Sequence, residues 1–205
     1  MTHTFRRLAL AALLAPALGG CYAAMMAGSM VRAHQREISV VLTPGTAPAD
    51  LARARNIGVK LQAFDARSGT LVAAVGSGDV NVGVYSDMLS TELLKQGYQA
   101  STLSEEFSEP LTSDQLGHLA SERIDLLLLG NLNLSTTTNF ASAMVGGDYG
   151  NTGVTSATLK CLDARTGRVL AVITAEYGAA KKASEVAADL SRAFADAVAG
   201  RATAQ

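Results

Sequence analysis

The run IDLLLLGNLNLSTTT, residues 124–138, constrains the fold more than any other stretch of this chain. A strand with one face in water alternates apolar and polar residues, but here four consecutive leucines occupy both faces. Such a continuous apolar run is typical of a strand whose sheet is covered on both sides. The sequence therefore predicts a sheet inside the molecule, with other elements packed against each of its faces.

Two stretches share one turn pattern, FDARSGTLVAAV at 64–75 and CLDARTGRVLAV at 161–172. In Asp-Ala-Arg-(Ser/Thr)-Gly, the Asp carboxylate accepts hydrogen bonds from backbone N–H groups two residues on, and Gly supplies a positive φ. Because strand periodicity flanks both turns, each stretch is predicted to be a β-hairpin. The alternative is a ligand site made of Asp65, Arg67, Asp163 and Arg165. Turn chemistry explains the pattern without a ligand, and we favour the turn.

Three segments, 84–98, 112–120 and 184–200, have helical periodicity. Their apolar stripes are Met88, Leu89, Leu93 and Leu94 in the first, Leu116, Leu119 and Ala120 in the second, and Val186, Leu190, Ala193, Phe194, Ala197 and Val198 in the third. The predicted helix ends are the capping box of Thr112 and Gln115, the N-cap Ser184, and the terminal glycines Gly97 and Gly200.

The order of the segments is strand-strand-helix-strand-helix, followed by three strands and a helix. This order predicts one α/β (α+β) domain at 55–200, a mixed sheet with two β-hairpins and three helices packed on it. We interpret 21–54 as a tether and linker, because TPGTAPAD at 43–50 is rich in Pro and Gly. Within it, ISVVL at 38–42 can add an edge strand, and 201–205 is a C-terminal tail.

Residues 1–20 are set aside from the fold, because they are typical of a secretory signal peptide. Two arginines precede an apolar run at 8–18, which is shorter than the roughly 20 residues that span a bilayer. Cys21 follows in LGGC, which resembles the lipobox of bacterial lipoproteins. The resemblance implies that Cys21 is acylated and anchors the chain to a membrane. Tyr22 after the cysteine implies the outer membrane, with the domain facing the periplasm.

Composition and motifs argue against nucleic-acid binding and catalysis. Removing residues 1–20 takes away two arginines and no acidic residue, which leaves a net charge of about −3 and no basic stripe. His34 lies in the tether, His118 is expected on the exposed face of its helix, and Cys161 is expected in the core beside other apolar strand residues. The acidic residues Glu105, Glu106 and Glu109 could hold a cation, but a solvated turn explains them. No catalytic residue, cofactor or metal is therefore predicted.

Several features together resemble a family of bacterial envelope lipoproteins. They are the lipobox, YSDMLSTELLKQGYQAS, IDLLLLGNLN, and ATLKCLDARTGRVL ahead of the last helix. The chain is similar over 55–199 to the curli-assembly secretion lipoproteins and to the outer-membrane activators of penicillin-binding proteins. The N-terminal domain of the Tol-system β-propeller protein has a comparable fold.

Two functions follow as hypotheses. The first is a non-enzymatic, lipid-anchored periplasmic adaptor or assembly factor that binds another envelope protein of unknown identity. The alternative is a subunit of a homo-oligomeric outer-membrane secretion pore of the curli-assembly type. Such a pore needs long hairpins with an apolar outward face, whereas 132–155 is polar at both strand parities and rich in glycine. The sequence therefore favours the adaptor.

Overall fold

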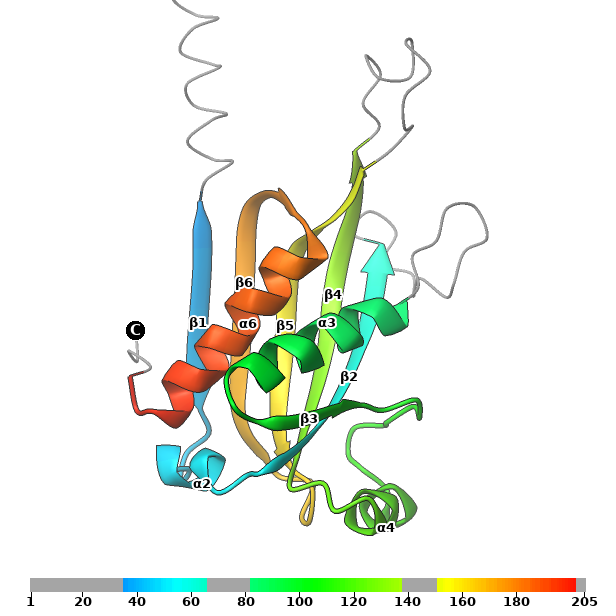
Figure 1. The fold of residues 1–205 in the computed structure, drawn as a ribbon, viewed down its shortest axis with the longest axis vertical. Coiled ribbons are helices and arrows are strands. Elements are labelled where there is room, and N and C mark those ends of the chain that lie inside the picture. The colour runs from blue at the N-terminus through cyan, green and yellow to red at the C-terminus, as the bar shows by residue number, and fades with distance from the viewer. Residues whose placement is uncertain (1–34, 66–81, 138–150, 202–205) are drawn as a thin grey trace, which may run out of the picture. The chain divides into compact units, whose positions relative to one another are not determined.

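The computed structural model describes residues 35–65, 82–137 and 151–201. Within these ranges, six strands form one mixed sheet in the order β1-β6-β5-β4-β2-β3, and four helices accompany it (Figure 1). The strands are β1 (Arg36–Leu42), β2 (Asn56–Asp65), β3 (Gln99–Thr102), β4 (Leu126–Thr137), β5 (Asn151–Asp163) and β6 (Val169–Lys181). The helices are α2 (Pro48–Ala52), α3 (Val82–Lys95), α4 (Ser113–Ser121) and α6 (Ala183–Val198). The predicted mixed α+β class is confirmed, and the three predicted helices correspond to α3, α4 and α6.

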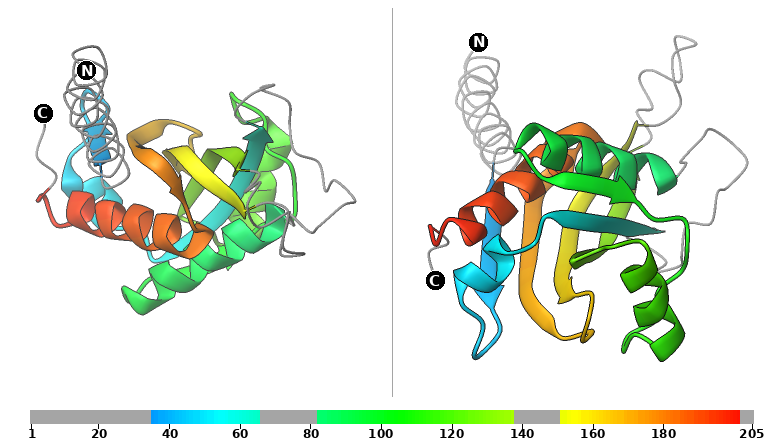
Figure 2. Two further views of the ribbon diagram at one scale, coloured as in Figure 1. Left: turned by 90° about the horizontal axis from the view of Figure 1, so that it is seen from above. Right: turned by 60° about the horizontal axis from the view of Figure 1, so that its bottom comes forward.

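The sheet combines parallel and antiparallel pairing. β2 pairs in parallel with β3 and with β4, whereas β4, β5, β6 and β1 pair antiparallel in succession. Parallel neighbours cannot be joined by a tight turn, and α3 and α4 lie in the connections from β2 to β3 and from β3 to β4. Seen from above, α3 and α6 lie on the same side of the sheet (Figure 2).

β4 is buried on both of its faces over its first half, as the run of leucines predicts. Leu126 and Leu128 belong to the larger hydrophobic core, which includes residues of α3 and α6. Leu127 and Leu129 belong to a second cluster, in which the fully buried Leu119 of α4 also takes part. Because side chains of adjacent strand residues point to opposite faces, the two clusters lie on opposite sides of the sheet.

Phe194 is the largest fully buried side chain of α6. Its ring centroid lies 5.2 Å from that of Tyr98 in an edge-to-face arrangement. The predicted apolar stripe of α6 is confirmed, since its members belong to the larger core or pack against it. In α3 the prediction is partly wrong: Leu89 and Leu93 are fully buried, but Leu94 is 54% exposed. One residue along a helix turns the side chain by about 100°, which takes Leu94 away from the sheet.

Helix α4 begins at the predicted capping box. Thr112 Oγ1 accepts a hydrogen bond from the Gln115 backbone N–H at 3.3 Å, and Gln115 Oε1 accepts one from the Thr112 N–H at 3.0 Å. The Gln115 amide also donates to the Glu106 carbonyl at 3.0 Å, which ties the preceding loop to the helix. Ala120, expected in the buried stripe with Leu119, is exposed.

Helix α6 has a different N-terminus from the predicted one. Its N-cap is Lys182, which makes no side-chain capping bond, and Ser184 lies within the first turn. The helix starts earlier because the Lys182 carbonyl already accepts the Glu185 N–H at 3.1 Å. Its predicted end is confirmed, since Gly200 follows the last turn with φ of +68°.

The turn between β5 and β6 forms as the Asp-Ala-Arg-(Ser/Thr)-Gly pattern predicts. Asp163 Oδ1 accepts hydrogen bonds from the backbone N–H groups of Arg165 at 2.8 Å and Thr166 at 3.2 Å. Gly167 has φ of +70°, and its N–H donates to the Asp163 carbonyl at 2.8 Å. This hairpin is confirmed. The corresponding turn after β2 lies outside the described residues.

Two elements, β1 and α2, precede residue 55 and pack with the sheet and the larger core. The edge strand expected at 38–42 is present as β1 and pairs antiparallel with β6, from Arg36 opposite Tyr177 to Leu42 opposite Ala171. Helix α2 follows and buries Leu51 completely. A five-residue helix is too short to show periodicity, and its proline and alanines are also typical of a linker.

Candidate functional site

The edge of the sheet at β1 has the features of a docking site. Among the described residues, β1 pairs with β6 alone and has no strand on its outer side. Ile38 and Val40 point toward α6 and pack against the larger core. Val41 points to the other face of the sheet and is 60% exposed. An edge strand with unpaired backbone groups can pair with an added strand.

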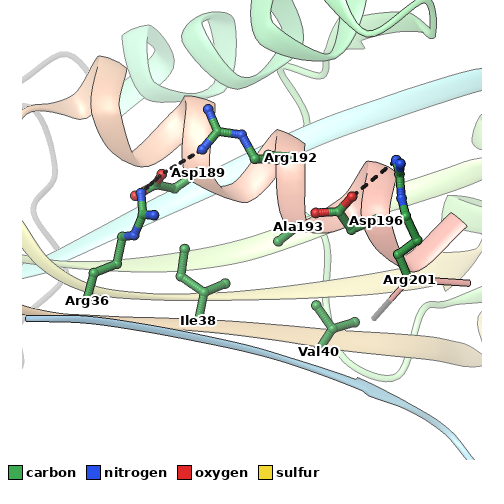
Figure 3. Close-up of a pocket in the computed structure, with 8 residues that line it drawn as sticks. All are labelled: Arg36, Ile38, Val40, Asp189, Arg192, Ala193, Asp196 and Arg201. Atoms are coloured by element: carbon green, nitrogen blue, oxygen red, sulfur yellow. Dashed lines mark hydrogen bonds and ion pairs between the residues drawn. The ribbon is translucent and has the colours of Figure 1, made fainter. Parts of the chain in front are cut away.

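A groove of about 230 Å³ lies between β1 and α6 (Figure 3). Ile38 and Val40 of β1 and Ala193 of α6 give it an apolar floor. The sequence did not predict this groove. The two walls of the groove come from segments about 150 residues apart in the chain. The alternation in ISVVL is therefore the one short-range pattern in the sequence that relates to the groove.

Charged side chains of both signs line the groove. Arg36 Nη1 donates to Asp189 Oδ1 at 2.7 Å, and Arg192 Nη1 lies 4.0 Å from the same oxygen. Asp196 and Arg201 form a further pair at 3.2 Å. Asp189 is 9% exposed, so its bond to Arg36 satisfies a carboxylate that would be costly to bury alone.

Tyr177 lies opposite Arg36 on β6, and its side chain is 7% exposed. Burial raises the pKa of its hydroxyl above the usual value, and the nearby Asp189 carboxylate raises this pKa further. The phenol therefore stays neutral. The groove itself combines an apolar floor with paired charges, an arrangement that can receive the side chains of an extended peptide.

The predicted acidic turn binds lysines of the sheet. Glu106 Oε1 lies 3.0 Å from Lys60 Nζ, and its carboxylate also accepts a hydrogen bond from Gln62 at 2.8 Å. These two hydrogen bonds lower the pKa of Glu106. Glu109 is paired with Lys160. Two of the three glutamates are therefore engaged with the sheet, which the spacing in the sequence does not reveal.

The predicted His118 position is confirmed, since this residue is partly exposed on α4. Its Nε2 lies 3.5 Å from Glu105 and 3.8 Å from Glu122. Cys21 lies outside the described residues, so lipid attachment stays a prediction. Of the residues named for a ligand site at the first turn, Asp65 is the last residue of β2, and Arg67 lies outside the described residues. In the described part of the chain, no helix is both long and apolar enough to cross a membrane.

Cys161 is fully buried in the larger core, as its strand position predicts, and burial raises the pKa of its thiol to about 12. At pH 8, about one thiol in 10,000 is then ionised in the folded protein. We expect negligible labelling of Cys161 by a thiol reagent in the folded Cys21→Ser variant, and stoichiometric labelling in urea. Rapid labelling without denaturant would show that the core opens at β5.

The raised pKa of Cys161 makes the free energy of unfolding depend on pH. Between about pH 8.5, the ordinary pKa of a thiol, and about pH 12, the unfolded chain releases a proton that the folded chain retains. The contribution of Cys161 to the free energy of unfolding is therefore full below about pH 8.5 and is lost as the pH rises through this window.

Comparison with known proteins gives partial structural similarities. No family model matches the sequence, and no curated protein is significantly similar to it. PelC of Paraburkholderia phytofirmans, solved as a dodecamer, is 14% identical over 80% of this chain and 97% of that chain, with a TM-score of 0.46. A DUF4136 family protein of Bacteroides thetaiotaomicron is 9% identical over 81% of this chain and 93% of that chain, with a TM-score of 0.36.

These neighbours correct the resemblance inferred from the sequence. They are PelC and a DUF4136 family protein, and not curli-assembly lipoproteins or activators of penicillin-binding proteins. The phrases that suggested those families encode a capped helix, a buried strand and a hairpin turn, which are local solutions that many folds share. The likeness to the N-terminal domain of the Tol β-propeller protein stays a prediction.

Proposed function

We propose that the protein is a non-enzymatic, lipid-anchored protein of the bacterial cell envelope. It is held at the outer membrane by Cys21, faces the periplasm, and acts as an adaptor or assembly factor by binding another envelope protein. The single observation that supports the binding role most is the combination of an open strand edge at β1 with the groove beneath α6.

The partner binds as an extended segment that adds a strand to the outer edge of β1. In this mode, backbone hydrogen bonds supply the affinity, and pockets for alternate side chains supply the specificity. Every second side chain of the added strand would then lie over the groove beside Ile38 and Val40, on an apolar floor. We therefore expect a partner segment with apolar residues at alternate positions.

A photo-crosslinking residue at Val41 tests the proposal in intact cells. Leu94 gives a matched control, because both side chains are large, apolar and exposed, 60% at Val41 and 54% at Leu94, but Leu94 lies on α3. We expect Val41 to give a covalent adduct with one envelope protein, through a peptide of alternating apolar pattern. We expect no such adduct from Leu94.

Two results would contradict the proposal. One is equal capture from Val41 and Leu94, which would show collision rather than docking. The other is an adduct from Val41 with a second copy of this chain alone, which would make the edge a contact of a homo-oligomer rather than an adaptor site.

A further inference from the structure

A second pocket, of about 240 Å³, lies at the end of the sheet that carries the β5–β6 turn. Arg53 of the segment after α2 and Arg165 and Arg168 of the turn line it, and no lysine does. The pocket is separate from the groove beneath α6, since the two share no lining residue. Three arginines from two segments far apart in the chain therefore line one open space.

The turn explains how two of these arginines, Arg165 and Arg168, come to line the same pocket. The Asp163 carboxylate is engaged with backbone N–H groups of the turn, so it fixes the backbone. Arg165 and Arg168 then stand on either side of Gly167, whose positive φ reverses the chain. The aspartate of the motif therefore builds the turn, while its arginine is left for other contacts.

The arginines are weakly neutralised by the carboxylates of the pocket. Asp125 also lines it, but its Oδ2 accepts the backbone N–H groups of Arg55 at 3.0 Å and Asn56 at 3.1 Å. Its other oxygen is 4.0 Å from Arg165 Nη2, a side chain that is 82% exposed. Charge-assisted hydrogen bonds are about 2.7–2.9 Å long, so this pair makes none.

The other two arginines have similar freedom. Arg53 Nη1 is 3.5 Å from Asp50 Oδ1, and the Arg53 side chain is 80% exposed. Arg168 has no carboxylate within 4.0 Å among the described residues. The three aspartates of the wall equal the three arginines in number, but each of them also accepts a hydrogen bond from a backbone N–H group. Among the described residues, these carboxylates therefore engage only part of the guanidinium donors.

We propose that this pocket binds a phosphate group. A guanidinium presents a planar fork of N–H donors that matches two oxygens of a phosphate. The ammonium group of lysine lacks this fork, so a pocket lined by arginines and by no lysine suits a ligand that is bound through two oxygens at a time. A phosphate offers enough oxygens for three forks, whereas one carboxylate does not. The phosphate is either free in solution or part of a phospholipid headgroup. The proposal stands independently of the partner site at β1.

Calorimetric titration of the full chain in detergent tests the proposal with two probes. Inorganic phosphate represents the free ion, and glycerol 3-phosphate represents the phosphate of a lipid headgroup. We expect binding of at least one probe with a dissociation constant on the order of 1 mM, or about −4 kcal/mol. A preference for the ester identifies the lipid source, and a preference for the free ion identifies the soluble one.

The variant Arg165→Gln/Arg168→Gln is expected to weaken this binding at least about tenfold, because it removes two of the three guanidinium groups. The matched control is Arg192→Gln, an arginine that is 63% exposed on the groove wall and far from the turn in sequence. Circular dichroism and the melting temperature confirm that both variants fold. Absence of binding to both probes, or equal weakening in the control, would overturn the proposal.

Discussion

Replacing Cys21 by serine is expected to move nearly all of the protein from the membrane fraction to the soluble periplasmic fraction. A serine cannot receive the thioether-linked lipid, so the variant loses every acyl chain at once. Each buried methylene contributes about 0.8 kcal/mol to membrane binding, and two chains already make an anchor stable, so the change in partitioning spans many orders of magnitude. Fractionation and immunoblotting measure it directly.

The natural control for this prediction is Cys161→Ala, which changes the other cysteine of the chain. Because Cys161 is buried in the core, this variant should remain in the membrane fraction. Mass spectrometry of the N-terminal peptide should show acyl chains on Cys21 in the control and in the unchanged protein. Recovery of Cys21→Ser in membranes after salt and carbonate washing would refute the anchor.

Replacing Phe194 by alanine is expected to lower the free energy of unfolding by about 3–5 kcal/mol. The ring is fully buried in the larger core, and the substitution also removes its edge-to-face contact with Tyr98. Since α6 forms one wall of the groove, the loss should also reduce crosslinking from Val41. Urea denaturation followed by circular dichroism measures the stability.

Leu94→Ala provides the comparison, because the sequence places Leu94 on a buried stripe as it does Phe194. The side chain is 54% exposed, so its truncation should change the stability by at most about 0.5 kcal/mol. Equal losses in the two variants would mean that α6 contributes no more to stability than an exposed leucine of α3.

The parts of the fold that follow from local chemistry could be predicted from the sequence. Four leucines in a row require cover on both sides of β4, Thr112 and Gln115 cap α4, and Asp163 with Gly167 turns the chain. In each case the residues that decide the structure lie within a few positions of one another. Their signal therefore survives in a single sequence.

The parts that depend on distant neighbours could not be predicted. The sequence predicts an edge strand at 38–42 but not which strand it pairs with, and it assigns α2 to a linker, because their place in the sheet and core is fixed by β6 and α6, more than 100 residues later. The groove and the arginine pocket arise in the same way, since each joins segments from both ends of the folded unit. No local pattern in the sequence predicts that Ile38 and Ala193 line the same groove, or that Arg53 and Arg168 line the same pocket.

The pairing of β1 with β6 also has a consequence for the order of folding. Arg36 lies opposite Tyr177, so the first strand of the sheet has its partner in the last. A growing chain exposes β1 throughout synthesis, and closing so long a loop is slow compared with forming the neighbouring β5–β6 hairpin. We therefore expect β1 to be enclosed after the β5–β6 hairpin has formed, and its apolar residues to stay open to aggregation until then.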